Sequence, residues 1–170
     1  MIMGYKIIVC VNNKGYIGKC GNLMYRISND LKNFKSQTIG NVVIMGRKTF
    51  ESLPNGNPLP DRINIVLTSD VNYKYDAKDK NVFIFNSIED VDSFCRLILP
   101  HLEWFVIGGG KVYKEFLDRD MCDEIRLTTV HDCVEGDTKF QLPNDWKTYY
   151  KSGTQVENGI EYDFSVLKKI

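Results

Sequence analysis

The chain alternates between short runs that are apolar at nearly every position and stretches in which apolar residues recur every three or four positions. Such runs are typical of strands covered on both faces. They occupy residues 5–11, 42–45, 63–68, 82–85 and 104–107. The helical spacing occurs at Ile27, Leu31 and Phe34, at Ile88, Val91, Cys95 and Ile98, and at Val112, Tyr113, Phe116 and Leu117. This alternation predicts a mostly parallel sheet with flanking helices.

The last third of the chain has a different pattern. Residues 124–130 indicate one more strand, and residues 146–151 and 160–167 lie on either side of an Asn158-Gly159 pair, a strong hairpin signal. We therefore predict an α/β fold, a single domain over residues 1–170 with a central, mostly parallel eight-stranded sheet, an antiparallel C-terminal strand and flanking helices. Ser28 and Ser87 stand where two helices begin and are the expected N-caps.

The composition narrows the class of protein. Lys and Arg together number 22, as do Asp and Glu, so the formal net charge is zero and there is no basic excess of the kind that marks nucleic-acid binders. No apolar run approaches the length of about 18 residues that would span a membrane. Five cysteines without a Cys-x-x-Cys pair, and only two histidines, argue against a disulfide framework and a metal site. We expect a cytoplasmic monomer that acts on a small molecule.

Two stretches share one design, in which a buried strand leads into glycine, then a cation, then a helix. The first glycine segment, residues 46–49, contains Gly46 and Arg47, and the second glycine segment, residues 108–113, contains three glycines and Lys111. A helix start presents free N–H groups and the positive end of its dipole, and glycine lets an anion approach closely. Two such sites indicate a dinucleotide, and the cations favour the additional 2′-phosphate of NADP(H) over plain NAD.

One carboxylate lies where the helical pattern calls for an apolar residue. Asp30 falls on the same face as Ile27, Leu31 and Phe34. Burying a carboxylate is costly unless something pairs with it. Two interpretations stay open. Asp30 lines a pocket, where it would bind an amidine-like group or support a proton transfer, or it complements the dipole in the first turn of a helix capped by Ser28.

The connection from residue 12 to residue 22 is polar and contains three glycines. It is longer than most connections between a strand and a helix. Long glycine-containing loops often act as mobile lids, and a plain solvated loop is the alternative.

Five motifs follow one another along the chain: NDLKNFK at 29–35, VVIMGRKTFESLP at 42–54, PLPDRINIVLTS at 58–69, VIGGGKVYKEFL at 106–117 and VEGDTKF at 134–140. In this order they resemble the dihydrofolate reductase family, and the resemblance covers essentially the whole chain. It implies hydride transfer from C4 of NADPH to C6 of 7,8-dihydrofolate with protonation at N5, which gives tetrahydrofolate. That activity supports one-carbon metabolism and thymidylate synthesis and is a target of antifolates.

The resemblance also assigns residues to the substrate. Asp30 would hydrogen-bond the 2-amino group and N3 of the pterin, Thr128 would assist it, and Tyr25 would hold a bridging water. These three are the expected catalytic residues. Arg62 would pair with the α-carboxylate of the substrate's glutamate, for which its planar fork is suited. The other residues expected around the substrate are Ile8, Val9, Leu31, Phe34, Leu53 and Ile107.

For NADPH the resemblance implies both glycine segments and a lid at residues 12–24. Arg47 and Ser69 would flank the 2′-phosphate, and a cis peptide is expected between Gly108 and Gly109. The residues expected around NADPH are Cys10, Ile17, Gly18, Gly46, Arg47, Lys48, Thr49, Thr68, Ser69, Ile107, Gly108, Gly109, Gly110, Lys111, Val112 and Tyr113.

The chain departs from the family's pattern at two points. Met24-Tyr25 stand where the family commonly has Pro-Trp, and Cys10 stands where alanine is frequent. Two other functions stay open, the pyrimidinone reductase of riboflavin synthesis, which also uses NADPH, and a non-catalytic dinucleotide-binding module. The combination of Asp30 with Arg62 argues against the first, whose substrate is a ribityl phosphate, and the second has no need of Asp30.

Overall fold

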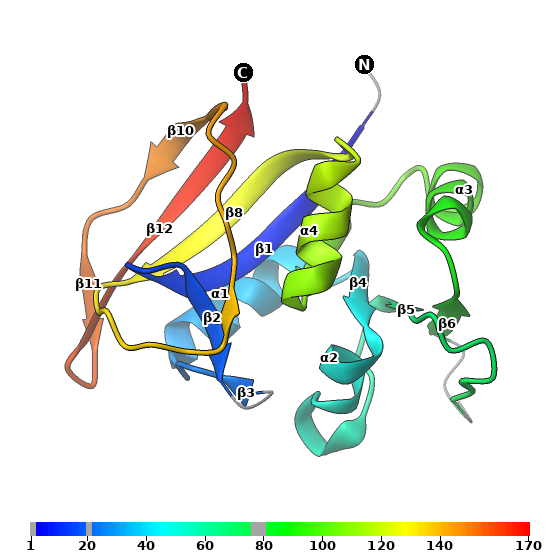
Figure 1. The fold of residues 1–170 in the computed structure, drawn as a ribbon, viewed down its shortest axis with the longest axis horizontal. Coiled ribbons are helices and arrows are strands. Elements are labelled where there is room, and N and C mark those ends of the chain that lie inside the picture. The colour runs from blue at the N-terminus through cyan, green and yellow to red at the C-terminus, as the bar shows by residue number, and fades with distance from the viewer. Residues whose placement is uncertain (1–2, 20–21, 76–80) are drawn as a thin grey trace.

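Eight strands pair side by side in the order β10-β12-β8-β1-β7-β4-β5-β6, and β11 pairs with β12. The structure is a computed structural model and describes residues 3–19, 22–75 and 81–170 (Figure 1). The strands are β1 Tyr5–Asn12, β4 Val42–Gly46, β5 Ile63–Leu67, β6 Val82–Phe85, β7 Trp104–Gly108, β8 Cys122–Val130, β10 Trp146–Lys151, β11 Gln155–Glu157 and β12 Ile160–Lys169. All pairs from β8 to β6 are parallel, and β12 is antiparallel to β8, β10 and β11. The predicted fold class is confirmed.

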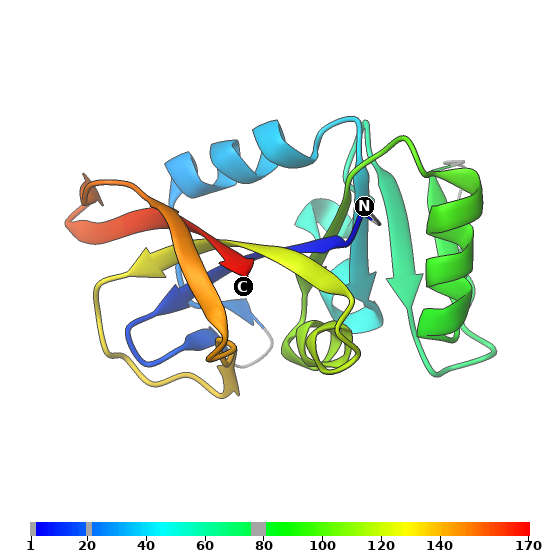
Figure 2. The same ribbon diagram turned by 90° about the horizontal axis from the view of Figure 1, so that it is seen from above.

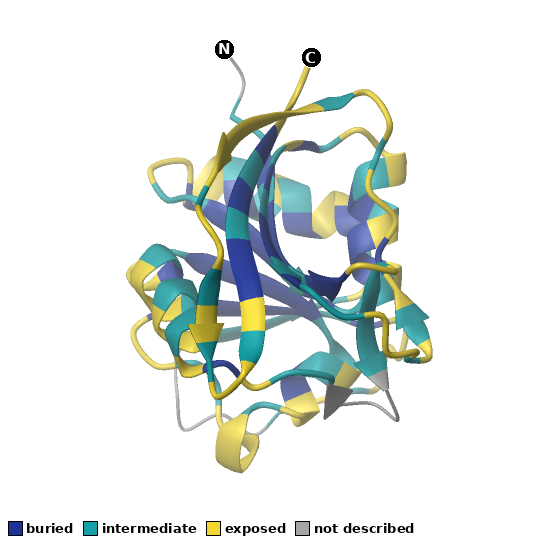
Figure 3. Cartoon of the chain, turned by 90° about the vertical axis from the view of Figure 1, so that its left-hand side faces the viewer, coloured by how far each residue is buried: buried dark blue, intermediate teal, exposed yellow. Residues whose placement is uncertain are grey.

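Helices cover both faces of the sheet, and Figure 2 shows α1 and α4 on opposite sides of it. The helices are α1 Ser28–Thr38, α2 Arg47–Glu51, α3 Ile88–Ile98 and α4 Gly110–Asp118, with a 3₁₀ turn at Pro54–Gly56. Val43 and Met45 of β4 pack with Phe50 of α2, whereas Ile44 packs on the side of α3 and α4. Successive strand residues point to opposite faces, so the inner strands are buried along most of their length (Figure 3). None of the helices in the described residues is both long and apolar enough to cross a membrane.

Of the two serines expected to cap helices, one does so and the other does not. Ser87 caps α3, because its Oγ accepts a hydrogen bond from the N–H of Asp90 at 3.2 Å, as predicted. The N-cap prediction for Ser28 is wrong, since the N-cap of α1 is Ile27, which has no side-chain oxygen, and Ser28 is the first helical residue. Ile98, counted in the apolar stripe of α3, is 59% exposed.

The loop expected to form a lid, residues 12–24 and called the lid segment below, contains strands that the sequence analysis did not predict. β2 (Tyr16–Lys19) pairs with β3 (Asn22–Leu23) and with β9 (Thr138–Lys139) in a small second sheet. The expected lid also included residues 20 and 21, which lie outside the described residues. The pairing of β2 with β9 fixes one side of this segment against the chain that follows β8.

The topology places the predicted cofactor residues along one edge. β7, β4 and β5 are neighbours and parallel, so their carboxyl ends at Gly108, Gly46 and Leu67 lie at the same edge. Ligands of open α/β sheets bind outside such carboxyl ends. The start of β1 and the end of β12 lie on another side of the molecule, both at the same end of β8 (Figure 1).

Candidate active site

Asp30 and Thr128 are brought together, as predicted. Asp30 lies in the first turn of α1, and the hydroxyl of Thr128, from β8, donates to Asp30 Oδ1 at 2.6 Å. Burial raises the pKa of the Asp30 carboxyl, and the hydrogen bond from Thr128 partly offsets this because it stabilises the ionised form. Within the described residues Thr128 is the one hydrogen-bond donor to Asp30. The second carboxylate oxygen is therefore free to accept from a ligand.

The raised pKa of Asp30 gives a prediction about the apo protein. A carboxyl whose pKa is higher in the folded state binds more protons there, so stability falls as pH rises through the window above the ordinary value of 3.8. Asn has no such ionisation. We expect Asp30→Asn to raise the melting temperature of the ligand-free protein at about pH 7, with the difference shrinking toward about pH 4. Thermal melts across this range check the sign, and a lower melting temperature at neutral pH would contradict it.

Cys10 of β1 and Tyr113 of α4, two of the residues expected around NADPH, lie close enough to Asp30 for its charge to act on them. Burial raises the pKa of the Cys10 thiol and of the Tyr113 phenol, and the Asp30 carboxylate adds to both shifts, so all three groups interact electrostatically. The Tyr113 hydroxyl donates to the backbone oxygen of Ile8 at 2.8 Å. This bond ties the second glycine segment to β1, the strand that contains Ile8 and Cys10. Cys10 stays a neutral thiol there and is unreactive.

Tyr25 makes contacts that the sequence did not indicate. Its hydroxyl donates to Asp132 Oδ1, and the buried amide of Asn12 lies 3.2 Å from the same hydroxyl. Burial and the bond to Asp132 raise the pKa of Tyr25 to about 12. The phenolic proton is thus committed to Asp132, which follows β8. The role of Tyr25 in holding a bridging water stays a prediction.

Asn12 connects the start of the lid segment to the chain after β8. Its Oδ1 accepts from the N–H groups of Lys14 and Tyr16, and its Nδ2 donates to the backbone oxygen of Val134 at 2.6 Å. Asn12 is 2% exposed. Sequence reasoning missed both Asn12 and Asp132, because an Asn or Asp beside a loop is too common to single out.

The two glycine segments adjoin each other. A Cβ on Gly46 would lie 3.2 Å from Val112 of the second segment, and a Cβ on Gly109 would lie 3.5 Å from Thr49 Oγ1 of the first. The peptide between Gly108 and Gly109 is cis, which confirms that expectation. Gly46 and Gly109 are the N-caps of α2 and α4, so two helix starts open at the same place.

Residues expected around the 2′-phosphate lie at the same edge. Arg47 is partly exposed, its Nε lies 3.8 Å from Glu51 Oε1, and its guanidinium is 5.7 Å from the centre of the Tyr73 ring. Ser69 and Lys48 are exposed, whereas Thr68 is buried and its hydroxyl accepts from the N–H of Asp70. Arg47 and Ser69 can therefore reach a ligand without loss of an existing strong bond.

The lid segment reaches the second glycine segment. A Cβ on Gly110 would lie 2.8 Å from Thr138 Cγ2 and 3.8 Å from Ile17 Cδ1. Gly18 accepts a hydrogen bond from the N–H of Asp137 at 2.9 Å. Ile17 is thus next to the predicted cofactor residues, and Gly18 is held by the chain that follows β8.

Arg62 is 5% exposed and is held in one orientation at the other end of α1. Its Nε donates to the backbone oxygen of Pro60 and its Nη1 to Thr38 Oγ1, both at 3.0 Å. Its guanidinium is 5.9 Å from the centre of the Phe34 ring, and burial lowers its pKa. Phe34, Leu53 and Ile107 share one apolar cluster, while Leu31 is 42% exposed. The pairing of Arg62 with a substrate carboxylate stays a prediction.

A cavity of about 250 Å³ lies elsewhere, lined in part by Thr129, His131 and Asp163. Thr129 follows Thr128 in β8, so this cavity opens on the sheet face opposite to Asp30. None of the predicted substrate or cofactor residues lines it.

Comparisons with known proteins show the family of this chain. A family model described as dihydrofolate reductase matches residues 5–169. The chain therefore belongs to the dihydrofolate reductase family, a family of NADP-dependent oxidoreductases.

Some relatives are dihydrofolate reductases that match along most of their length, and others are bifunctional proteins that match along about a third of it. The dihydrofolate reductase of Staphylococcus haemolyticus is 34% identical over 96% of this chain and 95% of its own length, and that of Bacillus subtilis (strain 168) is 37% identical over 90% and 87%. The bifunctional dihydrofolate reductase-thymidylate synthase of Daucus carota is 34% identical, and this chain spans about a third of its length, 34%. A solved dihydrofolate reductase from Enterococcus faecalis, complexed with NADP(H) and RAB-propyl, superposes with a TM-score of 0.82 at 31% identity over 98% of this chain and 96% of that one.

Proposed function

We propose that this chain catalyses the NADPH-dependent reduction of 7,8-dihydrofolate to 5,6,7,8-tetrahydrofolate, with hydride transfer to C6 and protonation at N5. The observation that carries the proposal is the partly buried Asp30 carboxylate, one oxygen of which accepts a hydrogen bond from Thr128 of the central sheet. Two neighbouring strands of the same sheet, β7 and β4, end in the two adjoining glycine segments. Each carboxylate oxygen can accept more than one hydrogen bond, so this group can accept from both N–H donors at the 2-amino and N3 edge of a pterin while Thr128 stays bonded to Oδ1.

The residues present fit NADPH. Gly109 leaves the space beside Thr49 open to a phosphate, and Arg47 supplies a positive charge next to the first helix start. Bound there, NADPH supplies the hydride. The chain's own residues orient the substrate and keep water from the reacting atoms. Asp30 and Thr128 hold the pterin, and the lid segment with Ile17 excludes water. The ionised carboxylate of Asp30 favours protonation of N5.

The direct test is the loss of NADPH absorbance at about 340 nm when 7,8-dihydrofolate is added. We expect turnover with dihydrofolate and none with the pyrimidinone of riboflavin synthesis. Turnover with the pyrimidinone alone would replace the proposal by that activity. NADPH binding without turnover of either substrate would leave a non-catalytic binding module.

The residues expected around the 2′-phosphate give a prediction about the choice between NADPH and NADH. Arg47→Gln combined with Ser69→Ala is expected to raise the KM for NADPH about tenfold to a hundredfold, because hydrogen bonds to a charged phosphate contribute about 1.5–3 kcal/mol. The KM for NADH, which has no 2′-phosphate, should change less than about threefold. Arg119→Gln, at the far end of α4, is the control. Equal changes for both cofactors would contradict the assignment.

We also propose that the protein works as a monomer in the cytoplasm, without a nucleic-acid partner. The zero formal net charge and the unpaired state of the described cysteines at 10, 95, 122 and 133 support this setting. Sedimentation analysis at micromolar concentration tests the oligomeric state.

A further inference from the structure

The helix that carries Asp30 has little apolar packing of its own. Thr38 is its one buried residue, whereas α3 buries Ile88, Val91 and Cys95 and α4 buries three residues as well. Helices in proteins are usually fixed by a buried apolar face. Apart from the buried N-cap Ile27 and the partly buried Phe34, the position of α1, and with it that of the Asp30 carboxylate, therefore depends on polar contacts at its two ends.

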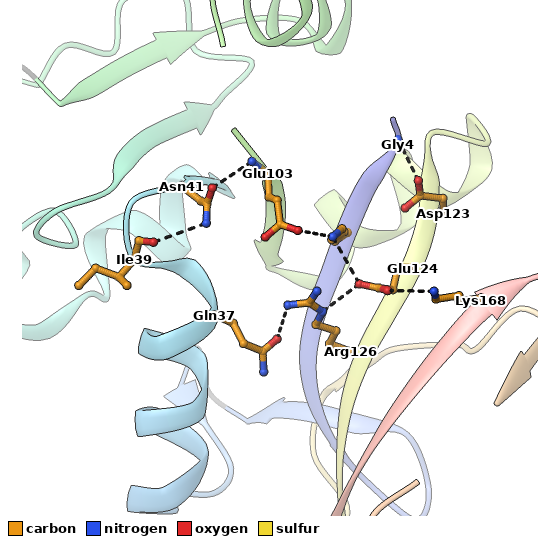
Figure 4. Close-up of polar contacts among 10 residues, drawn as sticks. Gly4, Gln37, Ile39, Asn41, Glu103, Asp123, Glu124, Arg126 and Lys168 are labelled. Carbon is orange, nitrogen blue, oxygen red and sulfur yellow. Dashed lines mark hydrogen bonds and ion pairs between the residues drawn. The ribbon is translucent and has the colours of Figure 1, made fainter. Parts of the chain in front are cut away.

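The C-terminal end of α1 is tied to the sheet by a network of charged side chains (Figure 4). Arg126 of β8 donates to Gln37 Oε1 at 2.8 Å and to Glu124 Oε2 at 2.9 Å. Glu124 in turn lies within ion-pair distance of Lys6 and Lys168. Glu124 is 12% exposed at its side chain, so this end has a fixed anchor in the sheet.

At the N-terminal end, one carboxylate from a distant part of the chain adds polar contacts beside the buried Ile27. Glu157 Oε1 accepts from the Ser28 hydroxyl at 2.8 Å and from the N–H of Asn29 at 3.1 Å, and Glu157 Oε2 accepts from the N–H of Ser28 at 2.6 Å. These N–H groups belong to the first turn of α1, which has no side-chain cap from Ile27. Glu157 thus does the work of an N-cap from outside the helix, and these bonds lower its pKa, so it is ionised at neutral pH.

The strand pair that presents Glu157 is well defined. Glu157 ends β11 and pairs with Ile160 across the Asn158-Gly159 turn, whose two residues both have positive φ, as a two-residue hairpin of this type requires. The side chain of Asn29 adds two bonds to the same hairpin, to Gln155 Oε1 at 3.0 Å and to the hydroxyl of Tyr162 at 3.1 Å. Tyr162 is 2% exposed, so the contact has a rigid base.

From these contacts we infer that Glu157 is a positioning residue for the substrate pocket: it holds the start of α1 on the β11–β12 hairpin and so fixes Asp30 against Thr128. The inference rests on the proposed function for its kinetic consequence. Asp30 is two residues beyond Ser28, so a shift of the helix start moves its carboxylate directly. The cofactor edge at β7, β4 and β5 has no part in these bonds.

Glu157→Ala is expected to raise the KM for dihydrofolate about 3- to 30-fold, the loss that removal of a helix cap produces, with the KM for NADPH changed less than about twofold. Glu157→Gln keeps an oxygen that accepts from Ser28 or Asn29 and should recover most of this loss. The matched control is Glu161→Ala, an exposed acid four residues further along in the same hairpin. A dihydrofolate KM at the wild-type value in Glu157→Ala would overturn the inference, as would an equal rise in both KM values.

A second measurement does not depend on activity. Hydrogen exchange of the amides at 28–31 should be at least about tenfold faster in Glu157→Ala than in wild type and closer to wild type in Glu157→Gln, while amides of α3 keep their rates. Unchanged exchange at 28–31 overturns the inference even where the wild-type protein reduces dihydrofolate. Faster exchange in a protein that fails to reduce dihydrofolate supports the inference about Glu157 and rejects the proposed function.

Discussion

Asp30→Asn is expected to lower kcat/KM for 7,8-dihydrofolate by about 30- to 1000-fold at about pH 7, a loss of about 2–4 kcal/mol of transition-state stabilisation. The substitution keeps the shape of the side chain and the oxygen that accepts from Thr128. It removes the charge that, in the proposed function, pairs with the pterin edge and favours protonation of N5. The amide also turns a donor toward the donors of the substrate, which leaves them unpaired.

Steady-state kinetics from about pH 5 to about pH 9 check this result. The loss should appear in kcat/KM at all pH values at which Asp30 is ionised. The control is Asp118→Asn, an exposed acid at the end of α4 that pairs with Lys114. Wild-type turnover by Asp30→Asn across this range would remove Asp30 from the chemistry. Together with the expected gain in melting temperature, the loss of activity would show that the site is kept at the expense of stability.

Gly136→Ala is the second substitution for which we expect a large effect. A Cβ at this position would lie 2.3 Å from the backbone oxygen of Gly18 and 2.7 Å from Met24 Sδ, far inside contact distance. A backbone oxygen cannot yield as a flexible side chain does, so the chain after β8 and the lid segment have to separate. The bond from the N–H of Asp137 to Gly18 lies at the same contact.

The expected results are a hydride-transfer step slower by about tenfold to a hundredfold and a free energy of unfolding lower by about 1–3 kcal/mol. Single-turnover measurement of NADPH oxidation isolates the hydride step from product release. Gly153→Ala is the matched control, because a Cβ there meets nothing within 4 Å. A hydride step at the wild-type rate in Gly136→Ala would show that the lid segment does not need this contact.

Local patterns were enough to predict most of the fold. The strands Val82–Phe85 and Trp146–Lys151 have the predicted bounds. The first is a short apolar run, a pattern that depends on short-range sequence. The Asn158-Gly159 hairpin follows from the backbone preference of two residues. The glycine segments could be singled out because anion binding at a helix start calls for glycine and a cation in consecutive positions.

The contacts that the sequence did not indicate join residues far apart in the chain. Glu157 replaces the expected cap at Ser28 from 129 positions away, and Asp132 bonds Tyr25 from 107 positions away. The residue types involved are ordinary for turns, and no local spacing distinguishes them. β2 and β9 were missed for the same reason, since these short strands form by pairing between segments that are far apart in the chain.

The location of the two chain ends has a practical consequence. β1 begins at Tyr5 beside the start of β8, and β12 ends at Lys169 beside the same end of that strand, whereas the glycine segments lie at the carboxyl ends of the parallel strands. An affinity tag, a surface linker or a fused domain at either end would therefore be attached away from the edge at which we propose that NADPH binds. Protein immobilised through a terminus should keep its binding site open to the solution.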